Sequence, residues 1–175
     1  HNEDRVAYVL APDGSLVLGA IDGMGGHSDG EIAADLVAET LVREIERGAH
    51  PEVSLQAANK EVHQHNVTHH SDSGAVAVAV QIRPPNQPGQ PHRAFFHWAG
   101  DARGLVARRN PKAKNRWEWT YRTVDDGLAP MSIQAGQDYD DGGAGRTVAM
   151  AIAPNANIVT KAFGMKDTIA IHSVE

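Results

Sequence analysis

The chain has 175 residues, a formal net charge of −6 and no cysteine. This length fits one domain, residues 1–175, with a sizeable core, and the acidic balance argues against nucleic-acid binding, which usually needs a basic face. No apolar run approaches the roughly 20 residues that cross a bilayer, and the lack of cysteine excludes disulfides and thiolate metal sites. We therefore expect a cytoplasmic protein that binds neither nucleic acid nor membrane.

The first two apolar runs, residues 6–11 and 16–22, predict a β-hairpin. Both are rich in β-forming residues, and the Asp13-Gly14 step between them favours a hairpin turn. With Asp13-Gly14 as a two-residue loop, paired residue numbers sum to 27. This register places Asp22 opposite Arg5 and, one step further, Gly23 opposite Asp4.

Three acidic residues, Glu3, Asp4 and Asp22, meet at the open end of this predicted hairpin. Carboxylates so close repel one another unless a cation or protons intervene. Hard oxygen ligands without cysteine favour Mg²⁺ or Mn²⁺ over softer metals. The alternative is a solvated hairpin end with ordinary surface acids.

A glycine-rich loop, Asp22-Gly23-Met24-Gly25-Gly26-His27-Ser28-Asp29-Gly30-Glu31, follows the second run. Its glycines allow positive φ angles and a close approach of the backbone to whatever Asp22 holds. The loop therefore presents one carboxylate and one bare carbonyl together.

Two helices are predicted after the loop. The first begins near Glu31, with Ser28 at capping-box spacing, and ends at Gly48 and Pro51. The second has Ser54 as its N-cap and runs towards His70.

Four histidines gather near the end of the second predicted helix: His63, His65, His69 and His70. The i, i+4 spacing of His65 and His69 suggests a metal site. No acid nearby completes such a site, so we interpret the group as a polar helix end with solvated histidines.

The remaining strands are predicted at residues 75–82, buried on both faces, and at residues 93–99, 105–109, 117–122 and 168–174. Asp101 lies in the turn Gly100-Asp101-Ala102-Arg103-Gly104. An aspartate in a glycine-flanked turn usually forms an Asx turn. Two helices followed by hairpins favour an α+β protein with helices packed on antiparallel sheets.

Residues 125–145 form a long, acidic, glycine-rich segment. A loop of this length in a compact domain is usually functional or disordered. We expect Asp138, Asp140 and Asp141 within it to be exposed to solvent rather than to bind a metal.

Four segments together resemble the metal-dependent protein phosphatases of type 2C, the PPM family, in their bacterial form. They are Asn2-Glu3-Asp4, the loop from Asp22 to Glu31, Ser73-Gly74-Ala75 and Gly100-Asp101-Ala102-Arg103. Each motif alone is weak, but all four occur in the order of the family over most of the chain, which makes the combination specific.

The resemblance implies an antiparallel β-sandwich flanked by helices, with residues 125–145 as the flap beside the active site. In this family arrangement Asp22 would bridge two Mn²⁺ or Mg²⁺ ions, and Glu3 and the Gly23 carbonyl would complete the second metal site. Asp4 would hold coordinated water, and Asp101 would serve a third, looser ion.

The implied reaction is hydrolysis of phosphoserine and phosphothreonine in proteins by a metal-bridged hydroxide, without a phosphoenzyme. Asp22 and Asp4 are the catalytic residues in this reading. The implied partners are phosphorylated protein substrates and a bacterial Ser/Thr kinase, or its targets, that the phosphatase would oppose.

The chain departs from the family pattern in three places. The phosphate-binding arginine of the family would precede His1, and Arg5 lies on the wrong side to replace it. Met24 stands where eukaryotic relatives have a histidine proposed as general acid, and His27 does not inherit that role. Two further metal aspartates would follow a strand like residues 168–174, but the chain stops at Glu175.

We therefore expect a fragment of a longer phosphatase, truncated at both ends and inactive or nearly so by itself. The alternative is a non-catalytic, phosphatase-like regulatory or binding module that lacks the downstream metal aspartates. The joint presence of Glu3, Asp4, Asp22 and Asp101 favours the enzyme, since a binding module would not need four acids directed at one place.

Overall fold

The computed structural model describes residues 2–24, 29–110, 117–126 and 159–175, apart from the side chain of Trp119. The elements in this part of the chain are β1 Asp4–Leu10, β2 Leu16–Met24, α1 Asp29–Glu46, α2 Pro51–His69, β3 Gly74–Arg83, β4 Arg93–Ala99, β5 Leu105–Arg109, β6 Trp117–Arg122 and β7 His172–Val174. No described helix is both long and apolar enough to span a membrane.

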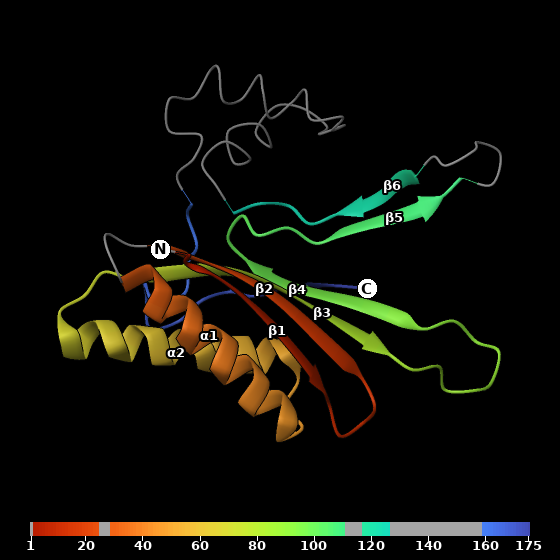
Figure 1. The fold of residues 1–175 in the computed structure, drawn as a ribbon, viewed down its shortest axis with the longest axis horizontal. Helices are drawn as coiled ribbons and strands as arrows, with labels where there is room; N and C mark the ends of the chain where they lie inside the picture. The colour runs from red at the N-terminus through yellow and green to blue at the C-terminus, as the bar shows by residue number, and fades with distance from the viewer. Residues whose placement is uncertain (1, 25–28, 111–116, 127–158) are drawn as a thin grey trace, which may run out of the picture.

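The strands form two antiparallel sheets. One has five strands in the order β1-β2-β3-β4-β7, and the other is the pair β5-β6. Both helices lie on one side of the large sheet, and β5 and β6 lie on the other side (Figure 1). The predicted α+β class, with helices against antiparallel sheets, is confirmed.

Strand β3 is the centre of the core because both of its faces are buried, as its continuous apolar sequence predicts. Ala75, Ala77 and Ala79 pack in the cluster that contains the apolar faces of both helices. On the opposite face, Val78 packs with Phe96 and Trp98 of β4. Small residues towards the helices and larger ones towards the second sheet let both layers approach the strand closely.

The predicted register of the first hairpin is wrong by one residue. Asp4 pairs with Asp22 and Arg5 pairs with Ile21, so paired numbers sum to 26. A shift of one residue moves every side chain to the opposite face relative to its partner strand. Asp4 and Asp22 are therefore direct cross-strand neighbours, on the sheet face turned away from the helices.

The turn explains this register. The Ala11 N–H donates to the Ser15 carbonyl at 2.8 Å, and the Gly14 N–H donates to the Ala11 carbonyl at 2.9 Å. Gly14 has φ of +83°, which a glycine adopts without strain. The loop thus has three residues ending in a left-handed glycine, rather than the two residues expected of an Asp-Gly hairpin.

The second helix begins four residues earlier than predicted. Pro51 occupies its first turn and His50 is the N-cap, because proline lacks the N–H that a helix leaves unpaired there and has a suitable φ angle. Ser54 is not the cap: it is buried inside the helix, and its hydroxyl donates to the His50 carbonyl at 3.1 Å. Pro51 therefore begins α2 and also ends the segment that connects α1 to it.

The C-terminal segment is mostly held without strand pairing. The predicted strand at residues 168–174 is reduced to β7, which pairs with β4. Asn59 of α2 donates to the carbonyls of Lys166 and Asp167 at 3.0 and 3.2 Å and accepts from the Gly164 N–H at 2.9 Å. This buried amide provides hydrogen bonds that a neighbouring strand would otherwise supply.

Candidate metal centre at the end of the sheet

The four predicted acidic site residues lie around one end of the large sheet. Asp4 and Asp22 lie opposite each other on β1 and β2. Glu3 immediately precedes β1, and Asp101 lies in the turn after β4. Asp4 and Asp22 are exposed, whereas Glu3 and Asp101 are half-buried.

The other three acids influence the electrostatics of Asp22. Partial desolvation raises the pKa of the Asp22 carboxyl, and the negative charges of Asp4, Asp101 and Glu3 raise it further. Asp4 also shares a hydrogen bond with Asp22 that favours the protonated form. The other three predicted acids thus all act on the carboxyl group of Asp22, and a bound cation would relieve their repulsion.

The carboxylate oxygens are not drawn together as ligands around an ion would be. In the part of the chain that the structure describes, the group whose ligand atoms all lie within 4.8 Å of one another is a different one, His50, Glu52 and His97. The donor set itself, carboxylates and a backbone carbonyl without sulfur, suits a hard divalent cation.

Gly23 and Gly30 bring the end of β2, the first turn of α1 and Glu3 into contact. A Cβ at Gly23 would lie 2.1 Å from the Gly30 carbonyl oxygen, and one at Gly30 would lie 2.3 Å from the Glu3 carboxylate. The Gly23 N–H also donates to the Glu3 carbonyl at 3.2 Å. The glycines of the loop are thus needed for close packing, and they place the Glu3 carboxylate beside the start of a helix, where negative charge is favoured.

Residues 25–28 of this loop, including His27, lie outside the described part of the chain, and so does most of the predicted flap. Only Asp125 and Asp126 of residues 125–145 are described. The predictions for Asp138, Asp140 and Asp141 therefore stay predictions.

The turn that carries Asp101 is anchored by residues that the sequence did not single out. The Gly100 N–H donates to Asp126 Oδ2 at 3.1 Å, and the Gly104 N–H donates to Thr123 Oγ1 at 3.0 Å. Arg103 forms an ion pair with Asp125. Both ends of the turn are therefore fixed to the segment after β6.

Asp126 also joins this turn to the C-terminal segment. It is buried, and its Oδ1 lies 2.8 Å from Lys161 Nζ and 2.9 Å from His172 Nε2. In the sequence, the Asp125-Asp126 pair had no feature that distinguished it from a solvated acidic run. Its role depends on contacts between segments far apart in the chain.

Arg5 points away from the four acids. Its guanidinium pairs with Asp35 and, at 2.9 Å, with Glu31, both on α1. This agrees with the sequence interpretation, which gave Arg5 no part in phosphate binding. The residue instead connects β1 to the helix layer.

The histidines near the end of α2 contact one another or the backbone. The rings of His65 and His69 stack with centroids 4.2 Å apart, and His69 Nδ1 lies 2.9 Å from the His65 carbonyl. His63 Nδ1 lies 3.2 Å from the Gly164 carbonyl. Their arrangement agrees with a polar helix end.

Bacterial serine/threonine phosphatases have the same fold as this chain. Phosphatase Stp1 from Staphylococcus aureus matches with a TM-score of 0.75 and 18% identity, over 99% of this chain and 65% of its own. The S. agalactiae serine/threonine phosphatase matches with a TM-score of 0.73 and 20% identity, over 99% and 67%. The Mycobacterium tuberculosis phosphatase PstP/Ppp matches with a TM-score of 0.65 and 21% identity, over 99% and 67%.

These matches confirm, at the level of the fold, the resemblance carried by the sequence motifs. The chain spans about two thirds of the length of the phosphatases it matches, 65 to 67% in these three. No protein-family model and no curated protein matches the sequence.

Proposed function

We propose that this chain is part of a metal-dependent protein serine/threonine phosphatase. The observation that carries the proposal is the convergence of Glu3, Asp4 and Asp101 on Asp22, whose pKa all three raise. The convergence occurs within a fold shared with bacterial serine/threonine phosphatases. A shared fold alone does not define an activity, so the acidic group is the necessary second support.

The acidic residues would bind Mn²⁺ or Mg²⁺ in the following way. Asp22 would contact two ions, Glu3 and the Gly23 carbonyl would complete one of the two sites, and Asp101 would contact a third. When bound, the cations would offset the negative charge of a phosphate group and make a water molecule more acidic. Asp4, which pairs with Asp22 across the strands, would accept a hydrogen bond from such a water and so orient it.

The proposed substrates are phosphoserine and phosphothreonine in proteins, including a Ser/Thr kinase or the targets of one. The site lies at an exposed sheet end, which suits a substrate presented on another protein better than a small molecule enclosed in a cavity. The second candidate is a non-catalytic phosphatase-like regulatory or binding module.

The test is hydrolysis of an aryl phosphate and of a phosphothreonine peptide by the natural full-length protein. We expect turnover that requires Mn²⁺ or Mg²⁺, stops when a chelator removes the metal and returns when the metal is restored. Turnover that persists in chelator would contradict the proposed chemistry. A folded protein that binds the phosphopeptide but never hydrolyses it would establish the module instead.

A further inference from the structure

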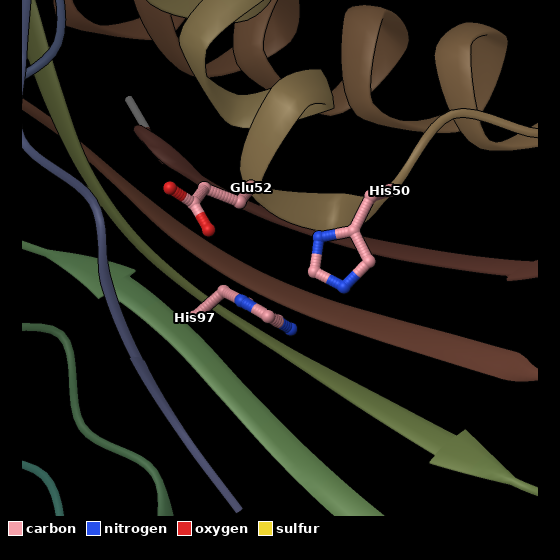
Figure 2. A group of neighbouring side chains, drawn as sticks. All are labelled: His50, Glu52 and His97. Atoms are coloured by element: carbon pink, nitrogen blue, oxygen red, sulfur yellow. The ribbon is translucent and has the colours of Figure 1, made fainter.

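A second group of side chains with potential metal-ligand atoms lies between the helix layer and the large sheet. His50 is the N-cap of α2, Glu52 is in its first turn, and His97 belongs to β4. Each offers one ligand atom, and these atoms all lie within 4.8 Å of one another. Figure 2 shows the three side chains converging from the helix and from the strand beneath it.

His97 has the features of a buried metal ligand. His97 is buried, with only 2% of the residue exposed. Nδ1 lies 2.9 Å from the Ser173 hydroxyl, but Nε2 is buried without a hydrogen-bond partner in the described part of the chain. An unpaired buried nitrogen costs free energy, and a cation would supply the missing partner.

The surroundings provide support for all three ligands. The Ser173 hydroxyl donates to Glu52 Oε2 at 3.4 Å and contacts His97 Nδ1, which fixes the carboxylate and the imidazole relative to each other. Hydrogen bonds of this kind typically orient the ligands of a metal site. His50 is exposed, so it can adjust to the shorter distances that coordination requires.

We propose that His50, Glu52 and His97 form a binding site for a transition-metal cation of the Zn²⁺ type. Two imidazoles and one carboxylate are a common ligand set for zinc and leave the fourth position to water. A cation here would fasten the start of α2 to β4 and β7.

This site is separate from the acidic group at the sheet end. Asp22 lies on the face turned away from the helices, whereas His97 pairs with Ala79 and faces them. The two sites also differ in chemistry, since imidazole favours Zn²⁺ and carboxylates alone favour Mg²⁺ or Mn²⁺. The proposal therefore does not depend on the phosphatase activity.

The test is titration of the metal-free chain with Zn²⁺ by calorimetry and with Co²⁺ by visible absorption, which reports tetrahedral coordination. With excess Mg²⁺ present to occupy the acidic group, we expect one equivalent to bind with the Co²⁺ signature. His50→Ala and Glu52→Gln should each weaken Zn²⁺ binding by about tenfold or more, at least as much as the loss of a supporting contact costs in metal sites. The matched control His65→Ala, a histidine at the other end of α2, should bind Zn²⁺ as the wild type does.

His50 and Glu52 are not buried, so their variants should keep the fold, and circular dichroism checks this. If the wild-type protein shows no saturable Zn²⁺ binding, the proposal is overturned. The contacts through Ser173 would then only join Glu52 and His97 by hydrogen bonds. Unchanged Zn²⁺ affinity in both variants, or a loss caused instead by His65→Ala, would also overturn it.

Discussion

Replacing Asp22 with asparagine is expected to reduce metal-dependent phosphatase activity by about 100-fold or more. Loss of a residue that merely supports a metal ligand typically costs about 10 to 100-fold, and Asp22 is proposed to contact two ions itself. The amide keeps the size of the side chain but removes the negative charge. The measurement is the rate of aryl phosphate hydrolysis by the full-length protein at saturating Mn²⁺.

The matched control is Asp13→Asn, at the other end of the same hairpin. Asp13 accepts a hydrogen bond from the Ser15 N–H at 2.9 Å, which an asparagine can still accept, so activity should be unchanged. Without metal, Asp22→Asn should be at least as resistant to heat as the wild type, because it removes repulsion among the acids. Equal activity in Asp22→Asn and Asp13→Asn would contradict the assignment of Asp22.

Replacing Gly23 with alanine is expected to destabilise the fold by about 3 kcal/mol, at the upper end of overpacking costs. The added Cβ would lie 2.1 Å from the Gly30 carbonyl oxygen and 2.7 Å from its carbon, both in the backbone of α1. Backbone cannot rotate away as a flexible side chain can, so the start of α1 would have to move. For a chain of this size the unfolding temperature should fall by about 6 to 12 °C, as measured by calorimetry.

Gly48→Ala separates this clash from the general effect of losing a glycine. Gly48 has φ of +87°, and a Cβ there would meet nothing within 4 Å. Its replacement should cost about 1 kcal/mol from backbone strain alone. If Gly23→Ala costs no more than Gly48→Ala, the close contact between β2 and α1 is not as described.

The order of strands and helices could be read from the sequence because each element has a clear local pattern. The apolar run of β3 indicates burial on both faces, and the stops at Gly48 and Pro51 separate α1 from α2. These patterns involve residues that are close together in the sequence. The α+β class could therefore be predicted without information about tertiary contacts.

The register of the first hairpin could not be read in the same way. The Asp13-Gly14 pair suits both a two-residue and a three-residue loop, and the hydrogen bonds of Ala11 decide between them. The difference of one residue in loop length determines whether Asp22 pairs with Arg5 or with Asp4. Asp4 and Asp22 thus lie at the same end of the hairpin, as predicted, but with a different pairing.

Contacts between distant segments were beyond sequence reasoning. Asp126 binds Gly100, Lys161 and His172, and no local pattern marks an aspartate that collects such partners. The group of His50, Glu52 and His97 could not be predicted for the same reason, because His97 lies on β4, far along the chain from the start of α2.

Binding of Mn²⁺ to the acidic group is the most direct test of the central claim, that Glu3, Asp4, Asp22 and Asp101 together form a site for divalent cations. Calorimetric titration of Mn²⁺ should show saturable binding to the wild type and to Asp13→Asn. Binding to Asp22→Asn should be weaker by about tenfold or more. Mn²⁺ affinity that is the same in Asp22→Asn as in the wild type would contradict the claim.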